Sequence, residues 1–200
     1  MIEVNWKSFS GDRNMKDLIL ASTSPRRKEL MELLGYDFKV MASHVEEHVD
    51  FSMKPDEIVQ NLARQKAEAV FNENRDAVVL GSDTVVVVDE QILGKPKDEN
   101  EAREMMQLLR NRTHQVITGV AILSEERKDI FANTTTVHFS NITDEEIEEY
   151  IKTPEAYDKA GGYAIQGWAG RFVPTVEGNY FTIMGLPISE VYEKLKNYDI

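Results

Sequence analysis

The sequence contains no cysteine, which excludes disulfide bonds, thiol nucleophiles and thiolate metal ligands. Positive charge is also scarce, because 23 lysines and arginines stand against 35 acidic residues and the net charge is -12. That balance counts against the broad basic surface of a nucleic-acid-binding protein, although it leaves room for a local basic pocket that holds a small anion. No apolar run approaches the roughly 20 residues that span a bilayer, and residues 1–16 lack the apolar segment of a signal peptide. We therefore expect a cytoplasmic protein without a membrane or nucleic-acid partner.

The length of 200 residues suits one domain, or two small lobes that share a core. A hydrophobic fraction of 42% and a charged fraction of 29% are those of an ordinary globular protein. The first strand-like segment begins at Leu18, so we expect residues 1–16 to be a flexible extension and residues 17–200 to be a single domain.

The pattern of apolar residues predicts alternating strands and helices in the first half of the chain and more hairpin-like strands in the second half. Helices are predicted for residues 25–34, with Leu30, Leu33 and Leu34 on the apolar face, and for residues 55–72, 100–110, 143–152 and 187–195. Strands are predicted for residues 18–21, 38–42, 77–88, 115–123, 130–140, 172–173 and 180–184. This order predicts an α/β fold in which helices flank a mixed sheet.

Asp83 is the most informative residue, because a lone acid interrupts the apolar strand predicted for residues 77–88. A buried, ionised carboxylate loses roughly several kcal/mol of hydration unless it is paired or binds a metal. The pattern allows two interpretations. Asp83 is a functional acid, or the segment 81–83 forms a turn or bulge in which Asp83 caps a backbone group.

A predicted strand end followed by Ser22, Ser24, Arg26 and Arg27 has the chemistry of a phosphate site. Ser24 is a candidate N-cap, and Pro25 then falls at the first helical position. The N–H groups of a helix N-terminus carry partial positive charge, and guanidinium groups bind phosphate bidentately. The alternative is an ordinary capped helix with surface arginines.

Acidic residues in the polar segment 43–53 are candidate metal ligands. Mg²⁺ takes oxygen ligands and needs only one or two carboxylates beside water and substrate phosphate. Glu46 or Glu47 together with Asp83 would suffice, although a solvated acidic loop has the same pattern.

Two lysines and an amide complete the candidates. Lys95 lies on a Gly-Lys-Pro turn and is a suitable point charge for a phosphate, while Lys66 lies on the predicted helix 55–72. Both patterns are equally typical of surface lysines. Gln166 lies in a Gly-rich segment, where its amide either reads a base edge or satisfies the loop backbone.

Taken together, these segments resemble the Maf family of nucleoside triphosphate pyrophosphatases, from about residue 18 to residue 200. No single segment is specific, but seven of them in order are. They are ASTSPRR at 21–27, VEE at 45–47, LARQKA at 62–67, GSDT at 81–84, LGKP at 93–96, DKAGGYAIQG at 158–167 and MGLP at 184–187.

The resemblance implies a single catalytic domain over residues 17–200 that hydrolyses the bond between the α- and β-phosphates of a nucleoside triphosphate. It implies a divalent metal, Mg²⁺ or else Mn²⁺ or Co²⁺. The Gly-Tyr-Ala-Ile-Gln-Gly segment is similar to the branch that acts on dTTP and UTP. The implied fold is a long, twisted mixed sheet with two lobes and a central cleft, similar to inosine triphosphate pyrophosphatases, and a homodimer is a possible assembly.

The resemblance also implies roles for individual residues. Asp83 would be the proton acceptor and, with Glu47, a metal ligand. Substrate choice would depend on Arg26, Thr84 and Gln166, and the residues around phosphates would be Ser22, Arg27, Lys66 and Lys95.

Two alternatives remain open at this point. The protein could bind nucleotides without hydrolysing them, as a regulator linked to cell division and septum formation. It could also be an enzyme whose substrates extend to modified pyrimidine triphosphates. Release of pyrophosphate from a panel of triphosphates distinguishes these possibilities.

Overall fold

The computed structural model describes residues 15–200. The predicted extension, residues 1–16, therefore lies outside the described residues except for Met15 and Lys16. Lys16 belongs to the folded part, because its backbone N–H donates to the carbonyl of Asp199 at 2.8 Å and its ammonium group pairs with Glu126. In the described part of the chain, no helix combines the length and the apolar character that crossing a membrane requires.

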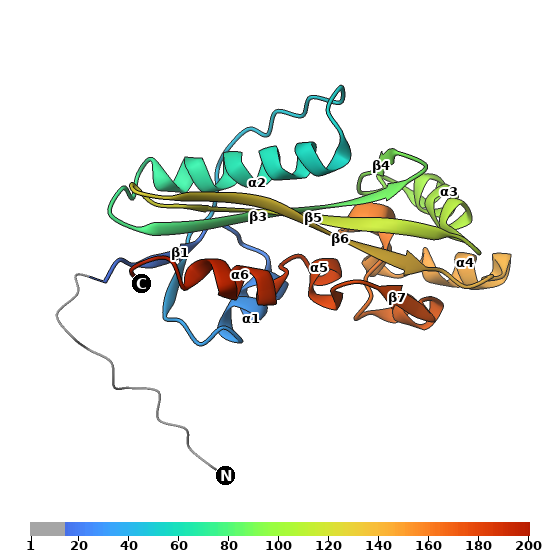
Figure 1. Cartoon of the computed structure of the whole chain (residues 1–200). Coiled ribbons are helices and arrows are strands. Elements are labelled where there is room, and N and C mark those ends of the chain that lie inside the picture. Colours follow the sequence, from blue (N-terminus) through green and yellow to red (C-terminus); the bar gives the residue numbers. More distant parts are fainter. Residues whose placement is uncertain (1–14) are drawn as a thin grey trace, which may run out of the picture.

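A seven-stranded mixed sheet forms the centre of the molecule (Figure 1). Its strand order is β2-β1-β3-β5-β6-β7, and β4 pairs with β3 beside this path. Strand β1 is parallel to both β2 and β3, and the remaining pairs are antiparallel. The strands are β1 (Leu18–Leu20), β2 (Phe38–Val40), β3 (Val78–Val88), β4 (Gln91–Leu93), β5 (Thr113–Leu123), β6 (Lys128–His138) and β7 (Thr175–Glu177).

One edge of β3 is only partly covered by neighbouring strands. Strand β5 pairs along the other edge, from Val79 to Val87. On the open edge, β1 covers β3 up to Leu80 and β4 covers it from Val86 onwards. Within residues 15–200, the stretch 81–85 therefore has no strand on this edge, and Asp83 lies at its centre.

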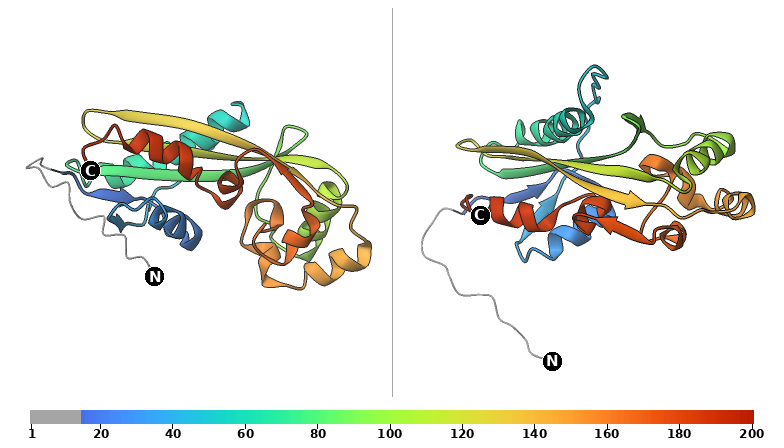
Figure 2. Two further views of the ribbon diagram at one scale, coloured as in Figure 1. Left: turned by 60° about the horizontal axis from the view of Figure 1, so that its bottom comes forward. Right: turned by 45° about the vertical axis from the view of Figure 1, so that its right-hand side comes forward.

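Helices cover both faces of the sheet (Figures 1 and 2). Helix α2 (Pro55–Phe71) lies on one face, and α1 (Pro25–Glu32) and α6 (Ile188–Leu195) lie on the other. Helices α3 (Glu99–Leu109) and α4 (Asp144–Tyr150) pack at the far end of the long strands, together with three short 3₁₀ helices. These are η1 (Pro154–Tyr157), η2 (Ala160–Gly162) and η3 (Trp168–Phe172). The structure confirms the predicted α/β fold with a long mixed sheet flanked by helices.

Periodicity located most elements within two residues at each end. The clearest case is α2, predicted for residues 55–72 and observed at Pro55–Phe71. Its 17 residues repeat apolar side chains at helical spacing, and that signal is specific for a helix packed on one side.

The predicted strand at residues 180–184 is wrong, because this segment is the helix α5 (Tyr180–Met184). Aromatic and β-branched residues favour a strand, but capping decides here. The side chain of Asn179 accepts from the N–H of Phe181, and Gly185 ends the helix with a φ of 103°.

Two smaller predictions also fail. Residues 172–173 are not a strand, since Phe172 ends η3 and the nearby strand is β7 at Thr175–Glu177. Leu33 is 66% exposed, although it was placed on the apolar face of α1. The helix ends at Glu32; it buries Leu30, as predicted, and also Met31.

Candidate active site

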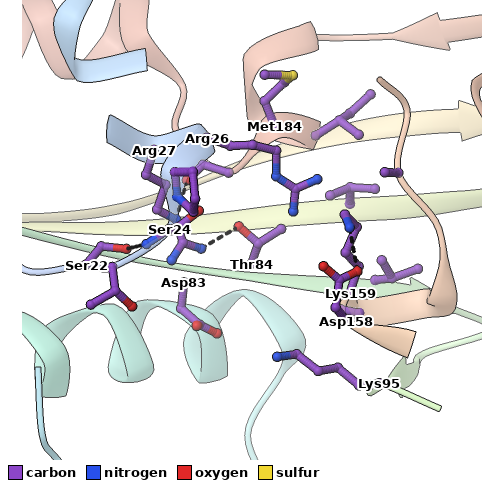
Figure 3. A pocket seen from close by; sticks show the side chains of 18 of the residues that line it. Ser22, Ser24, Arg26, Arg27, Asp83, Thr84, Lys95, Asp158, Lys159 and Met184 are labelled. Carbon is purple, nitrogen blue, oxygen red and sulfur yellow. Dashed lines mark hydrogen bonds and ion pairs between the residues drawn. The ribbon is translucent and has the colours of Figure 1, made fainter. Parts of the chain in front are cut away.

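A cavity of about 810 Å³ opens at the uncovered stretch of β3. Its walls come from both ends of the sheet: the segment 21–27 that enters α1, residues of the segment 158–165, and the end of α5. Figure 3 shows charged side chains of these segments around the cavity. The predicted cleft between two lobes corresponds to this cavity.

Asp83 lies in the cavity wall on an unbroken strand. It pairs in register with Gly119 of β5, so the alternative interpretation, a turn or bulge at residues 81–83, is wrong. Its side chain is 15% exposed and forms an ion pair with Lys66 of α2. The Nζ atom of Lys66 also lies 3.2 Å from Oε1 of Glu47, so one ammonium group joins both carboxylates.

Two glycines allow α2 to approach the sheet closely enough for this contact. A Cβ atom on Gly81 would lie 2.6 Å from the carbonyl oxygen of Ala63, and one on Gly119 would lie 2.4 Å from that of Val59. Both distances are far below contact distance, so any side chain would displace α2. The absence of side chains at these two glycines lets α2 pack close enough to the sheet for Lys66 to contact Asp83.

Thr84 and Ser82 occupy the opposite face of β3, because successive side chains of a strand alternate. The guanidinium group of Arg27 donates to Thr84 Oγ1 at 3.1 Å and to the carbonyl of Gly185 at 3.0 Å. Ser82 donates to the same carbonyl at 2.9 Å. Burial lowers the pKa of Arg27, and the charge of Asp83 opposes this shift. The guanidinium group remains charged, since arginine is not deprotonated in proteins.

The segment before α1 leaves polar groups facing the cavity. Ser24 occupies the predicted N-cap position, but its side chain makes no capping hydrogen bond, and Pro25 follows as the first residue of the helix. The hydroxyl of Ser22 accepts from the N–H of Ser24 at 3.2 Å. Among residues 15–200, the side chains of Arg26 and Lys95 have no hydrogen-bond or ion-pair partner, so both cations are available to a ligand.

The cavity is positively charged although the protein is strongly acidic. Its lining has more cations than carboxylates, whereas the whole chain carries a net charge of -12. A local excess of cations in a concave site attracts anions. The lining cations are Arg26, Arg27, Lys66, Lys95 and Lys159, and the lining acids are Glu47, Asp83 and Asp158.

Comparison with known proteins identifies the family. The family model described as Maf-like protein matches residues 17–198. The chain belongs to the Maf family. A protein of Bacillus cereus (strain G9842) named dTTP/UTP pyrophosphatase is 49% identical over 93% of this chain and 97% of its own length. A protein of the same name from Bacillus pumilus (strain SAFR-032) is 48% identical over 93% of this chain and 98% of its own length. A solved structure, the Ham1 protein of Staphylococcus aureus, aligns with a TM-score of 0.45 at 16% identity, over 63% of this chain and 73% of its own.

Most of the residues proposed from the Maf resemblance line this one cavity. They are Ser22, Arg26, Arg27, Glu47, Lys66, Asp83, Thr84 and Lys95. Glu46, the other acid considered as a metal ligand, is exposed and is not part of the lining.

Gln166 is not brought to the cavity wall. It is exposed, and the lining ends at its neighbour Ile165. The turn that follows is held by Glu155, whose carboxylate accepts from the backbone N–H groups of Trp168 at 2.7 Å and Ala169 at 3.2 Å. Base reading by Gln166 therefore stays a prediction.

Several lining residues of this Maf-family site were not singled out from the sequence. Asp158 and Lys159 pair with each other at the cavity wall, and their signal was their place in the segment 158–167. The hydroxyl of Ser43 is buried without a hydrogen-bond partner in the described chain and also lines the cavity. No sequence pattern marked Ser43.

His114 lies outside the cavity lining but contacts a residue that belongs to it. Its Nε2 atom lies 2.6 Å from the hydroxyl of Tyr163, a lining residue, and the two rings pack edge to face. Burial lowers the pKa of His114 to about 4, and His138 adds to the shift. The imidazole is therefore neutral at neutral pH and acts as a structural hydrogen-bond partner.

The donor set fits a hard divalent cation. No group of three or more potential metal ligands occurs within residues 15–200. Glu47 and Asp83 nevertheless contact the same Nζ atom, so both carboxylates face one point at the cavity. Two carboxylates are what Mg²⁺ uses when substrate phosphates and water supply the other ligands.

Proposed function

We propose that this Maf-family protein hydrolyses dTTP and UTP to the monophosphate and pyrophosphate. The observation that carries the proposal is the positively charged cavity around Asp83 in a protein whose net charge is -12. A triphosphate is a compact polyanion and needs such a site. The relatives named dTTP/UTP pyrophosphatase align over nearly the whole chain, and their name is the basis for proposing dTTP and UTP as the substrates.

Asp83 is the proton acceptor in this proposal. Its Oδ1 atom pairs with Lys66, which fixes the orientation of the carboxylate. Its Oδ2 atom has no hydrogen-bond partner among residues 15–200 and takes a proton from the attacking water. The water oxygen forms the new bond to the α-phosphorus, the bond from the α-phosphorus to the oxygen that bridges to the β-phosphate breaks, and pyrophosphate leaves with that oxygen.

The cations hold the triphosphate and offset its charge. Arg26 and Lys95 have no partner in the described chain, so binding phosphate breaks no existing contact. Arg27 is already oriented by Thr84 and Gly185. Preorganised cations of this kind stabilise the charge of the leaving pyrophosphate, which is the main source of rate in phosphoryl-type reactions.

We also propose that Glu47 and Asp83 hold a divalent cation, with Mg²⁺ first and Mn²⁺ or Co²⁺ as alternatives. When bound, such an ion neutralises phosphate charge and lowers the pKa of water. Lys66 would then keep the two carboxylates in place from the side of α2.

The first experiment compares Asp83→Asn with Asp76→Asn by release of pyrophosphate from saturating dTTP. Asp76 is exposed and does not line the cavity, so its variant controls for the loss of one negative charge. We expect Asp83→Asn to lose about 10²–10⁴-fold in kcat, because a general base contributes that much. Near-normal turnover of Asp83→Asn would refute the proposed role. Absence of pyrophosphate release by the unmodified protein would favour a non-catalytic nucleotide-binding regulator.

A further inference from the structure

A buried hydroxyl group in the cavity wall has no hydrogen-bond partner. Among residues 15–200, two buried polar side-chain atoms lack a partner, and they are Oγ of Ser43 and Nδ1 of His114. His114 is not part of the cavity lining, whereas Ser43 is. By contrast, the buried hydroxyl of Ser82 donates to the carbonyl of Gly185 at 2.9 Å. A buried donor without an acceptor is costly, so an unpartnered hydroxyl beside a cavity points to an acceptor that a ligand supplies.

The sheet topology brings Ser43 to the edge at which the cavity opens. Strands β1 and β2 are parallel, and Leu20 pairs with Val40 where both strands end. The contact extends one residue further, because the N–H of Met41 donates to the carbonyl of Leu20 at 3.0 Å. Ser22 follows β1 and Ser43 follows β2, so both residues lie beyond the carboxyl ends of parallel strands. Ligands of open α/β sheets bind at such ends.

The other groups of the lining favour an anion that carries oxygen acceptors. The hydroxyl of Ser22 accepts from the N–H of Ser24 at 3.2 Å, and its own proton has no acceptor within residues 15–200. The protons of Ser22 and Ser43 are therefore both left for a ligand. The cations Arg27 and Lys66 line the same cavity. A phosphate oxygen has the negative charge that these cations attract and the lone pairs that a hydroxyl donor needs.

We propose that Ser43 is a further phosphate-binding residue, whose hydroxyl donates to a phosphate oxygen of the triphosphate. This inference deepens the proposed function and rests on it for the identity of the ligand. The residue as a whole is partly exposed although its hydroxyl is buried, and no hydrogen bond fixes its rotamer. Rotation about the Cα–Cβ bond therefore turns the hydroxyl towards a bound phosphate without breaking a hydrogen bond.

Titration calorimetry measures Kd for a non-hydrolysable dUTP analogue and for inorganic tripolyphosphate, which has neither base nor sugar. We expect Ser43→Ala to weaken the binding of both probes by about tenfold or more, because a hydrogen bond to a charged acceptor is lost. Ser43→Thr keeps the hydroxyl and should stay within about threefold of the wild-type Kd. Ser52→Ala is the matched control and should leave both Kd values unchanged. Ser52 is exposed, lies outside the lining and donates its hydroxyl proton to Asp50 at 2.6 Å.

The stability of the free protein separates this role from a purely structural one. Removing an unpartnered buried hydroxyl breaks no hydrogen bond, so the urea midpoint of Ser43→Ala should equal or exceed that of the wild-type protein. A lower midpoint would show that the hydroxyl has a partner in the free protein, and it would overturn the inference.

The binding data can overturn the inference in three further ways. The first is an unchanged Kd in Ser43→Ala, and the second is an equal loss of affinity in Ser43→Thr, since the hydroxyl would then not be the group that matters. The third is a loss of affinity for the dUTP analogue alone, which would place the hydroxyl at the base or sugar.

Failure of the proposed function gives a different result. If the wild-type protein binds the dUTP analogue but releases pyrophosphate from no triphosphate, hydrolysis is refuted, and the Kd values still decide the role of Ser43. If the wild-type protein binds neither the analogue nor tripolyphosphate, the inference itself is overturned.

Discussion

At the scale of the residue, the site depends on which face of β3 each side chain occupies. Asp83 and Thr84 are adjacent in sequence but point to opposite faces, because strand side chains alternate. Asp83 meets Lys66 of α2, and Thr84 meets Arg27 of α1. Two consecutive positions therefore contact helices on opposite faces of the sheet, and both line the cavity.

A buried histidine provides a prediction at the same scale. The folded state lowers the pKa of His114 from 6.5 to about 4, so the unfolded state binds the proton first as the pH falls. The contribution of neutral His114 to stability is therefore complete above pH 6.5 and is lost as the pH falls towards 4, by about 3 kcal/mol in total.

Urea unfolding at pH 7.5 and at about pH 4.5 tests this prediction. We expect the free energy of unfolding to fall less between the two pH values in His114→Gln than in the wild-type protein. His48→Gln is the control, because His48 is exposed and forms hydrogen bonds with Gln65 only through its backbone. An equal fall in wild-type protein and His114→Gln would show that burial of His114 does not govern acid stability.

At the scale of the element, the position of α2 on the sheet decides whether the site exists. The helix carries Lys66, and its height above β3 and β5 is set by Gly81 and Gly119. Small residues on α2, among them Ala63, complete the close approach. Helix propensity and periodicity predict α2 itself but not its short distance from the sheet, because that distance depends on glycines in two other elements.

Gly119→Ala should therefore destabilise the fold and impair the site together. The new methyl group would lie 2.4 Å from the carbonyl oxygen of Val59, so the helix must move. We expect a loss of about 1–3 kcal/mol in the free energy of unfolding, as for overpacked cores, and a fall in kcat. Gly94→Ala is the control, since nothing lies within 4 Å of its added Cβ. Equal stability of the two variants, measured by urea unfolding, would contradict the account of the seating of α2.

At the scale of the whole molecule, the cavity joins segments from nearly the full length of the chain. Its lining runs from Ala21 to Gly185 and includes both ends of the long sheet. Although the net charge of the chain is -12, cations outnumber carboxylates in the lining of this cavity. A bound triphosphate would therefore connect both ends of the fold.

A non-hydrolysable dUTP analogue should accordingly raise the melting temperature. At an analogue concentration of about 100 times Kd the linkage free energy is about 2.7 kcal/mol, which corresponds to about 5–10 °C for a chain of this size. Lys95→Ala should reduce the shift at the same concentration, because Lys95 lines the cavity. Lys97→Ala should not, because Lys97 lies two residues further on and outside the lining. Differential scanning fluorimetry measures both, and an equal shift in the two variants would exclude Lys95 from binding.

Prediction from the sequence succeeded where local physics decides. The apolar spacing of α2 predicts that helix from its own residues, and α4, predicted for residues 143–152, begins at a capping box formed by Thr143 and Glu146. It failed at residues 180–184, where residue preference favours a strand and the cap at Asn179 with the left-handed Gly185 favours a helix. A segment of five residues is too short for periodicity to arbitrate.

The sequence by itself determined the chemistry of this protein: an acid inside an apolar strand, two arginines at a helix N-terminus, and no thiol. Only the tertiary structure decided which groups meet. It placed Lys66 between Glu47 and Asp83, left Gln166 outside the lining and brought Arg27 to Thr84. The physical reason is range, because hydrogen bonds act over about 3 Å, and such distances between remote segments are set by packing rather than by local sequence.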